Sequence, residues 1–250
     1  MVSAIAERWY SNKELDRAAK LLCDLATGKI ETPDEQALDR ALVIVEDFCN
    51  RHTIALASAV ADLETTLALV GLSWEGTSRI KKTETIIDKL SRRQTWLTVS
   101  KMQDIAGCRA TLPTQEDVSR VMDQLLALYA QRTDTPTRVR DYVTKPQASG
   151  YRAIHLYTNY DGLRVEVQLR TTLQSRWAHY TEFLTDMTGV DYKSGFGEPR
   201  VHEMLVELSH SYAGIDDKIV EGNKLVRQIS SATDTVPVVF NWDSTITMLR

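Results

Sequence analysis

The amino-acid sequence predicts an α+β protein in which a mixed sheet is flanked by helices from both ends of the chain. Two observations support this prediction. Apolar residues recur about every 3.6 positions through most of the first hundred residues and again after Thr171, as they do in amphipathic helices. Between these regions, short apolar runs bounded by turn residues indicate strands.

The part of the chain up to about residue 75 is predicted to be helical. Pro33 and Asp34 mark the start of a second helix, because proline and acidic residues are favoured in a first turn. A third helical segment is expected at residues 53–70 and a fourth at residues 78–93. The apolar residues at helical spacing in the first two segments are Leu15, Ala18, Ala19, Leu22 and Leu25, then Leu38, Ala41, Leu42, Val45 and Phe48.

The middle of the chain has the signals of strands and of one further helix. Cys108–Leu112 is short, apolar and followed by Pro113, as expected of a buried strand. A capping box from Thr114 to Asp117 then predicts the start of a helix. The dipeptide Asp161-Gly162 lies between two strand-like runs and is typical of a tight hairpin turn. The helix is expected to bury Val118, Val121, Met122, Leu125 and Leu126.

After Thr171 the helical pattern returns and continues to about residue 230. Without an internal repeat or an obvious linker, the simplest organisation is a single domain over residues 1–230, with C-terminal helices at about 172–230. Residues 231–250 form a tail that alternates like a strand. The tail is expected to be either an added edge strand or the start of a regulatory segment.

Bulk composition indicates an ordinary globular chain, with 43% hydrophobic and 26% charged residues. No apolar run approaches the roughly 20 residues of a membrane helix, so we expect a cytoplasmic protein without a membrane partner. Cys23, Cys49 and Cys108 lack the spacing of metal ligands and are expected to be reduced core thiols. The net charge of −4 gives no global attraction for nucleic acid, so a polyanion would have to meet local basic clusters.

The predicted hairpin places alternate side chains on opposite faces. One face is apolar and is expected to be core. The other is either a solvated face or a site, and its mixture of aromatic, imidazole, carboxylate and guanidinium groups favours a site. The apolar face carries Ile154, Leu156, Val165, Val167 and Leu169, and the other carries Tyr151, His155, Tyr157, Glu166, Gln168 and Arg170.

Two upstream segments also carry charged residues that allow two interpretations. In the segment "SRIKKTETIIDKL", Arg79, Lys82 and Lys89 are either an exposed helix face with acidic partners or a functional cluster. Asp104 stands just ahead of a predicted buried strand and Arg109 near its start. An aspartate in this position is either a turn or cap residue or a metal ligand.

Four separated segments, "RIKKTETIIDKL", "MQDIAGCR", "RVRDYVTKPQASGYRAIH" and "VEVQLRT", resemble in order and spacing the synthetase domain of the RelA/SpoT family of alarmone synthetases. The resemblance extends from about Ser11 to Asp217. It implies a five-stranded mixed sheet with flanking helices, related to nucleotidyltransferases. It also implies a Mg²⁺-dependent pyrophosphokinase that moves the β,γ-diphosphate of ATP to a ribose 3'-hydroxyl.

The same resemblance implies roles for individual residues. Asp104 would bind Mg²⁺, and Glu166 would either share the metal or take the proton from the attacking hydroxyl. Tyr151 would stack on the acceptor base. The donor ATP would be held by Arg79, Lys81 and Lys89, with Arg109 against its adenine, and the acceptor by Arg140, Gln147, His155 and Gln168 around Tyr151.

The loop before Tyr151 departs from the family pattern. Gln147 stands where alarmone synthetases usually carry a lysine that reaches acceptor phosphates, and Ser149 stands where many relatives have asparagine. Together with "LQSRWA" at residues 173–178, this resembles the toxic small alarmone synthetases, which include phage-associated and toxin–antitoxin members. Several of these modify the 3'-CCA end of tRNA. The leading expectation is therefore a tRNA-modifying toxin, which would need an antitoxin or inhibitor protein as partner.

Two other functions remain open from the sequence. The chain is either an alarmone synthetase that uses GDP or GTP, or an inactive relative that serves as a binding module. An RNA acceptor would require a basic track, for which the candidates are Lys13, Arg17, Lys20, Arg92 and Arg93; the alternative for the first three is a solvated helix face.

The expected chemistry depends on two structural conditions. Asp104 and Glu166 must converge on one cation, and the ring of Tyr151 must not be closed off in the interior. A glycine-rich segment, Asp191–Pro199, is expected to be a connection, and its Lys193 either lacks a functional role or touches the substrate.

Overall fold

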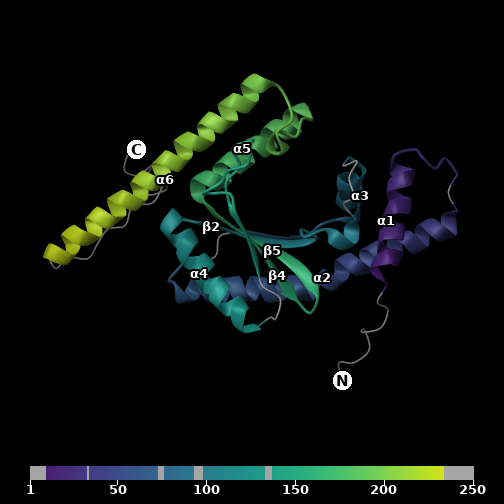
Figure 1. Ribbon diagram of the computed structural model, residues 1–250, viewed down its shortest axis with the longest axis horizontal. Helices are drawn as coiled ribbons and strands as arrows, with labels where there is room; N and C mark the ends of the chain where they lie inside the picture. The colour runs from purple at the N-terminus through teal and green to yellow at the C-terminus, as the bar shows by residue number, and fades with distance from the viewer. Residues whose placement is uncertain (1–9, 33, 73–75, 93–97, 133–136, 234–250) are drawn as a thin grey trace. The chain divides into compact units, whose positions relative to one another are not determined.

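The computed structural model of the protein describes residues 10–32, 34–72, 76–92, 98–132 and 137–233. Its helices and strands are labelled in Figure 1. In chain order they are α1 (Asn12–Ala26), α2 (Glu35–Leu69), β1 (Gly76–Ile80), α3 (Thr83–Arg92), η1 (Val99–Lys101), β2 (Ala106–Leu112), α4 (Gln115–Arg132), β3 (Arg138–Asp141), β4 (Ile154–Tyr160), β5 (Leu163–Thr171), α5 (Thr172–Thr188), η2 (Tyr192–Ser194) and α6 (Pro199–Thr233).

The strands form one five-stranded sheet in the order β1-β2-β5-β4-β3. This architecture confirms the predicted α+β fold with a mixed five-stranded sheet and helices. The edge strand β3 runs antiparallel to β4, and its register places Arg138 opposite Tyr157 and Arg140 opposite His155. Residues opposite each other on neighbouring strands share a face, so Arg140 and His155 lie on the same side of the sheet.

The hairpin between β4 and β5 turns at the predicted dipeptide. Asp161 and Gly162 both have positive φ angles, 50° and 82°, as a turn with two left-handed central residues requires. The side chain of Asn159 accepts a hydrogen bond from the Gly162 amide at 2.8 Å. The short local signal was therefore sufficient to place this turn. The same is true of α4, where the Thr114 hydroxyl accepts from the Asp117 amide at 3.1 Å and caps the helix.

Helix α2 is longer than the sequence pattern predicts. We expected separate segments that meet near residues 50–53, but one helix runs from Glu35 to Leu69 without a break. The polar residues at the expected break are tolerated because His52 packs inward, with an exposed fraction of 2%. Its ring lies against Phe48, and its Nδ1 is 2.8 Å from the Phe48 carbonyl oxygen.

The expected helix at residues 78–93 is also corrected. Its first residues belong to strand β1, and α3 begins only at Thr83. The cause is long-range pairing: a Cβ atom at Gly76 would overlap the carbonyl oxygen of Arg109, so only glycine allows β1 to approach β2 so closely. The Lys81 amide donates to the Ile105 carbonyl at 2.8 Å just beyond the strand.

The chain divides into two compact units. The first comprises Met1–Val60, Ser78–Gly107 and Asn159–Glu166, and the second comprises Ala61–Thr77, Cys108–Thr158 and Val167–Arg250. Helix α2 and strands β2 and β5 each contribute residues to both. Whether residues 1–230 behave as one domain stays a prediction.

The first unit has its core between α1, α2 and α3. Helices α1 and α3 contact each other in this core (Figure 1). Helix α1 begins with a capping box, in which Ser11 caps the helix and Glu14 returns the hydrogen bond. The predicted apolar stripe is confirmed at Leu15, Ala18, Ala19 and Leu22, all of which are buried in this core. Leu25 and Leu42, expected to be core residues, are instead 36% and 39% exposed.

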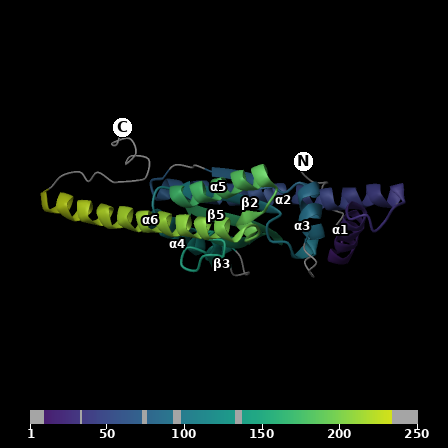
Figure 2. The same cartoon turned by 90° about the horizontal axis from the view of Figure 1, so that it is seen from above.

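The second unit buries Val118, Val121 and Leu125 of α4, as predicted, whereas Met122 and Leu126, also expected to be buried, are half-buried. Helices α5 and α6 pack side by side, as both views show (Figures 1 and 2). Helix α5 starts at Thr171, whose hydroxyl accepts from the Gln174 amide at 3.2 Å and donates to the Asp216 carboxylate of α6 at 2.7 Å. The cap thus joins the end of β5 to α6.

Three remaining expectations concern the cysteines, the membrane and the tail. Cys49 and Cys108 are buried, as expected of core thiols, whereas Cys23 is half-buried. Burial raises the pKa of the Cys49 thiol to about 11, so it stays protonated. In the described part of the chain, no helix is long and apolar enough to span a bilayer. Residues 234–250 lie outside the described residues, so the strand expected in the tail stays a prediction.

Candidate functional site

In the first unit, Asp104 is the centre of a charged cluster. It lies in the segment between η1 and β2. The Lys81 and Lys89 ammonium groups both reach its Oδ2, at 2.5 and 2.6 Å. Lys81 also donates to the Asp104 carbonyl oxygen at 3.2 Å. Three residues predicted for the donor site are therefore in contact, and we call Lys81, Lys89 and Asp104 the Asp104 cluster.

The electrostatics of this cluster favour an added anion. Burial alone would raise the pKa of the Asp104 carboxyl, but Lys81 and Lys89 outweigh it and hold this pKa below its usual value. Burial lowers the pKa of Lys81, and the nearby charges of Lys89 and Arg79 act in the same direction. Two ammonium groups thus share one carboxylate, and the charge of Arg79 acts on Lys81 as well, which leaves excess positive charge for phosphate groups.

Glu166, the second predicted carboxylate, is 8% exposed on β5. Its Oε2 is 4.0 Å from the position that a Cβ atom would take at Gly107. Gly107 follows Asp104 by three residues at the start of β2. Glycine at this position therefore leaves room beside the Glu166 carboxylate, and convergence of the two carboxylates on one cation stays a prediction.

The oxygen donors of this unit suit a hard cation. Both ammonium groups bind Oδ2 of Asp104. The described residues contain no group of three or more His, Cys, Asp or Glu side chains arranged to hold a metal. Asp104 and Glu166 are both carboxylates, and proteins commonly bind Mg²⁺ through one or two carboxylates together with substrate phosphates.

The other two predicted donor residues lie on the neighbouring strands. Arg79 is exposed on β1. Arg109, in the second unit, points a guanidinium nitrogen to the Thr77 hydroxyl at 3.4 Å. Contact of Arg109 with an adenine stays a prediction.

In the second unit, Tyr151 is the centre of a hydrogen-bonded chain. The Arg170 guanidinium donates to the Tyr151 hydroxyl at 2.5 Å and to the Gln168 Oε1 at 2.8 Å. The Tyr151 hydroxyl is 2.7 Å from Nε2 of His155, whose Nδ1 is 3.3 Å from the Tyr157 hydroxyl. Because the phenol accepts from Arg170, its own proton is available to Nε2. Tyr151, His155, Gln168 and Arg170 therefore act as one network.

The structure corrects the expectation that the ring of Tyr151 is open. Tyr151 is 2% exposed and belongs to the core cluster that contains Trp177 and Tyr192. The Lys193 ammonium lies over its ring, 5.2 Å from the centroid, and Arg170 lies over it at 5.0 Å. In this conformation a base cannot stack on Tyr151. Lys193 is one of the side chains that cover the ring.

Lys193 is held by a short, well-anchored turn. It lies on η2, where Asp191 caps the turn by accepting from the Ser194 amide at 3.1 Å. The ring of Tyr192 packs beneath Gly197, whose φ of +109° and lack of a side chain allow this contact. The Lys193 ammonium also pairs with Glu182 of α5 at 3.3 Å. The glycine-rich segment expected to be a plain connection thus places a cation at Tyr151.

The remaining predicted acceptor residues lie beside this network. Arg140 is exposed on β3, opposite His155. Gln147 is exposed in the turn before Tyr151. Its backbone carbonyl accepts from the Gly150 backbone amide at 2.9 Å, and its backbone amide donates to the Tyr151 backbone carbonyl at 3.2 Å. These hydrogen bonds hold the backbone of Tyr151 in place.

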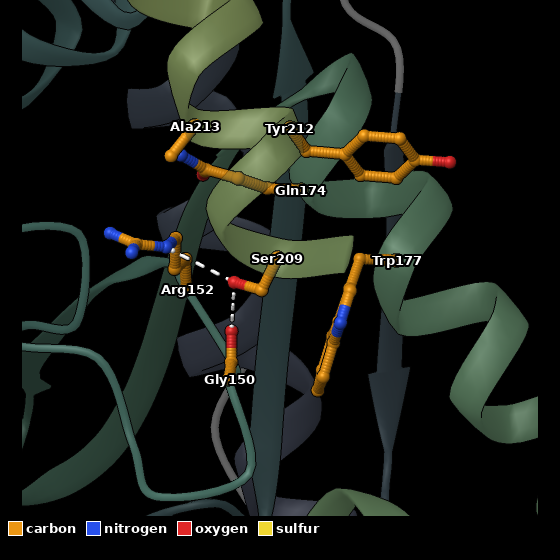
Figure 3. A pocket seen from close by; sticks show the side chains of 7 residues that line it. All are labelled: Gly150, Arg152, Gln174, Trp177, Ser209, Tyr212 and Ala213. Atoms are coloured by element: carbon orange, nitrogen blue, oxygen red, sulfur yellow. Dashed lines mark hydrogen bonds between the residues drawn. The ribbon is translucent and has the colours of Figure 1, made fainter. Parts of the chain in front are cut away.

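Helix α6 forms hydrogen bonds with the same turn and with Arg152 (Figure 3). Ser209 of α6 donates to the Gly150 carbonyl oxygen and accepts from Nε of Arg152 at 3.1 Å. Trp177 of α5 donates to the Leu205 carbonyl at 2.8 Å. The small pocket between these groups is lined by Gly150, Arg152, Gln174, Trp177, Ser209, Tyr212 and Ala213.

The predicted RNA-binding residues are only partly described. Lys13, Arg17 and Lys20 are exposed on α1, and Lys20 forms an ion pair with Asp24. Arg92 ends α3, but its side chain and all of Arg93 lie outside the described residues. The basic track therefore stays a prediction.

Sequence reasoning assigned no definite role to three charged side chains at or near Tyr151. Arg170 was placed on the polar hairpin face without a role, Lys193 was left with two alternatives, and Glu182 was not considered. The alternation along β5 was a usable signal for Arg170. Nothing local indicated that Lys193 lies over Tyr151 or that Glu182 pairs with Lys193, because both contacts are long-range and the second depends on the packing of α5 against η2.

Comparison with known proteins agrees with this geometry. Residues 78–185 match the family model described as the region found in RelA/SpoT proteins. The matched region contains both carboxylates and most of the residues discussed above. The fold of the small alarmone synthetase 1 from Bacillus subtilis, in a crystal structure bound to its product pppGpp, matches with a TM-score of 0.62 and 26% identity, over 73% of this chain and 97% of that one.

Two sequence relatives give the range of similarity. A GTP pyrophosphokinase of Bacillus subtilis is 29% identical over 62% of this chain and 74% of its own length. An uncharacterized protein of Mycobacterium bovis is 38% identical over 48% of this chain and 44% of its own length. The chain therefore matches less than half of the mycobacterial relative, and the similarity is concentrated in the RelA/SpoT region.

Proposed function

We propose that this chain, which contains a RelA/SpoT synthetase region, is a diphosphotransferase that moves the β,γ-diphosphate of ATP to the 3'-hydroxyl of a nucleotide ribose. The observation that carries the proposal is the Asp104 cluster, in which Lys81 and Lys89 meet one partly buried carboxylate. The matched RelA/SpoT region and the pyrophosphokinase relative support the same activity.

The cationic side chains of the first unit would hold the donor. Transfer of a phosphoryl-type group requires neutralisation of charge around the moving phosphates and alignment of the nucleophile, with little covalent help from protein. Lys81, Lys89 and Arg79 supply positive charge, and burial of Lys81 strengthens its attraction for a phosphate. Arg109 would contact the adenine.

Asp104 and Glu166 are the residues that would hold Mg²⁺. A bound Mg²⁺ would neutralise charge on the transferred phosphates. When ATP binds, its phosphates would compete with Asp104 for the two lysines, which would free Oδ2 for other partners. Glu166 would either share the cation or accept the proton of the attacking hydroxyl.

The acceptor would bind through the Tyr151 network. Its base would stack on Tyr151 once Lys193 has moved, with Arg140 and His155 on the same side of the sheet. The oxygen of the acceptor 3'-hydroxyl would then form a bond to the β-phosphorus of ATP. The bond from that phosphorus to the bridging oxygen breaks, and AMP leaves.

Among acceptors, a guanosine nucleotide has the stronger support. The relatives include a GTP pyrophosphokinase, and a structural neighbour was solved with pppGpp. We therefore rank GDP or GTP ahead of tRNA, which reverses the order that the sequence alone suggested.

One observation favours the second candidate, the 3' end of tRNA. Gln147 is neutral and exposed at the position where the family usually carries a lysine, so it neutralises no phosphate of a free nucleotide. An RNA end carries a single phosphodiester on the acceptor ribose and demands less charge. A toxin of this kind would need an inhibitor protein as partner.

Incubation with γ-labelled ATP, Mg²⁺ and either GDP, GTP or deacylated tRNA would test the proposal. We expect label in a guanosine nucleotide, whereas label in RNA would support the second candidate. Asp104→Asn and Glu166→Gln should each lower the rate by about 10²-fold or more, because each removes a carboxylate from the reacting centre. Label in no acceptor, from a protein that binds ATP, would refute the activity and leave the binding-module alternative.

A further inference from the structure

The charges around Tyr151 are not balanced. Arg170 is 1% exposed, and among the described residues its Nε and Nη1 have no hydrogen-bond partner. Its remaining contacts are with neutral groups, the Tyr151 hydroxyl and the Gln168 amide oxygen. Together with Lys193 and Arg109, its charge also lowers the pKa of the nearby Glu182 carboxyl, against the effect of burial. Because two of its nitrogens are buried without a hydrogen-bond partner in the described part of the chain, a further anion would stabilise this guanidinium.

Lys193 adds a second cation to the same place. Its ammonium lies 5.2 Å from the centroid of the Tyr151 ring, and its side chain is 34% exposed, so it is reachable from solvent. Glu182 is its carboxylate partner, at 3.3 Å. Burial is the largest cause that lowers the pKa of Lys193. The charges of Arg170 and Arg109 lower it further, whereas Glu182 raises it. Lys193, Arg170 and Arg109 thus share one carboxylate, that of Glu182.

We propose that Lys193, backed by the buried Arg170, is the residue that binds the 5'-phosphate of the acceptor nucleotide. The proposal rests on the proposed function for the role of Tyr151. The phosphate would draw the ammonium away from the ring and from Glu182, and the ring would become free to stack on the base. Binding of the phosphate would thus move Lys193 and expose the Tyr151 ring in the same step.

This assignment explains how a neutral Gln147 can stand in the preceding turn. The positive charge missing there would be supplied from η2, a segment outside the sheet. The ligand chemistry is a phosphate on the 5'-oxygen of the acceptor ribose. A guanosine nucleotide and the terminal adenosine of tRNA both carry it, so the experiment needs one arm for each.

Binding in the presence of a saturating, non-hydrolysable ATP analogue would test the assignment without turnover. Isothermal titration calorimetry would compare guanosine with GMP, and adenosine with the methyl ester of AMP, which carries a 5'-phosphodiester as the terminal adenosine of tRNA does. We expect the 5'-phosphate to improve affinity about tenfold in one of these pairs, as for a charge-assisted contact. Lys193→Ala should abolish the gain, Lys193→Arg should keep most of it, and ATP affinity should not change.

Two variants separate this role from damage to the fold. Lys218→Ala removes an exposed lysine of α6 and should behave like the wild type. Glu182→Gln releases Lys193 from its carboxylate and should strengthen the phosphate-dependent binding a few fold, which structural damage would not do.

The outcomes distinguish this inference from the proposed function. Equal or tighter phosphate-dependent binding by Lys193→Ala would overturn the inference, because Lys193 would then only cover the ring. No gain from the 5'-phosphate in the wild type, in either pair, would also overturn it. Phosphate-dependent binding that is lost in Lys193→Ala, without label transfer by the wild type, would support the inference and refute the enzymatic activity.

Discussion

At the scale of single residues, the protein buries several carboxyl groups, and the side chains next to each one decide whether its pKa rises or falls. Asp104 remains ionised because Lys81 and Lys89 both meet it. At Asp216, burial outweighs the Thr171 hydrogen bond and the charge of Arg152, both of which lower its pKa. It is 4% exposed, and its main contact is the Thr171 hydroxyl. Burial raises the pKa of Asp216 from 3.8 to about 6, and the neighbouring charge of Asp217 adds to this increase.

This difference makes a prediction about stability and pH. The folded state favours protonated Asp216, so its contribution to stability is greatest below pH 4 and decreases as the pH rises towards 6. Asp216→Asn can still accept from Thr171 but cannot ionise. We expect the variant to gain on the order of 2 to 3 kcal/mol over the wild type between pH 4 and 7, measured by urea denaturation.

Asp217→Asn provides the matched control for Asp216→Asn. Asp217 is exposed beside Asp216 on the same helix, so the same chemical change there should shift the free energy of unfolding much less. A wild type and Asp216→Asn variant with parallel pH profiles would show that Asp216 ionises normally in the folded protein.

At the scale of elements, helix α6 determines the position of the turn that leads to Tyr151. Gly150 has a φ of +91°, and a Cβ atom there would lie 3.1 Å from Val206 Cα and from Ser209 Cβ. Gly150→Ala should therefore combine backbone strain with displacement of α6. We expect a loss of about 2 kcal/mol or more in the free energy of unfolding, together with weaker acceptor binding and unchanged ATP binding.

Gly162→Ala separates the two causes. Gly162 has a similar φ of +82°, but an added Cβ would meet nothing within 4 Å. Its loss of stability reports backbone strain alone, and the excess loss in Gly150→Ala reports packing against α6. Equal losses in the two variants, measured by thermal denaturation, would contradict the support of the turn by α6.

The same scale separates what sequence could predict from what it could not. The hairpin turn at Asp161-Gly162 and the cap at Thr114 were predictable, because a few neighbouring residues determine them. Strands β1 and β3 were not, because their exposed residues show no apolar alternation and only pairing with β2 and β4 defines them.

The candidate site divides in the same way. The Asp104 cluster was predictable, since the motifs that resemble RelA/SpoT proteins contain all three of its residues. The closed state of Tyr151 was not, because it results from Lys193 and Trp177, which follow at long distance in the chain. Alternation correctly gave the residues of the polar face, but it could not indicate that His155 and Arg170 on that face are buried.

At the scale of the whole molecule, the net charge of −4 constrains any use of RNA as acceptor. Attraction would depend on a few local cations, of which Lys13 and Arg17 are exposed on α1. If tRNA is the acceptor, reversal of both charges should strongly reduce tRNA labelling, leave ATP binding intact and reduce the salt dependence of RNA binding by about one to two ions.

Charge reversal at Lys218 and Lys224 changes the net charge equally and serves as the control, since both are exposed on α6. Similar effects of the two double variants would indicate dependence on total charge and not on α1. Unchanged tRNA labelling after reversal at Lys13 and Arg17 would remove them from the RNA-binding surface.

The position of Lys193 on the turn η2, outside the sheet, has a consequence for engineering the acceptor preference. This cation is carried outside the strands, on a short connection whose shape depends on Asp191, Tyr192 and Gly197. Substitutions in a connection of this kind leave the strand residues of the donor side untouched. If Lys193 binds the acceptor as proposed, libraries randomised at residues 193–196 would change acceptor preference while the donor side keeps its residues.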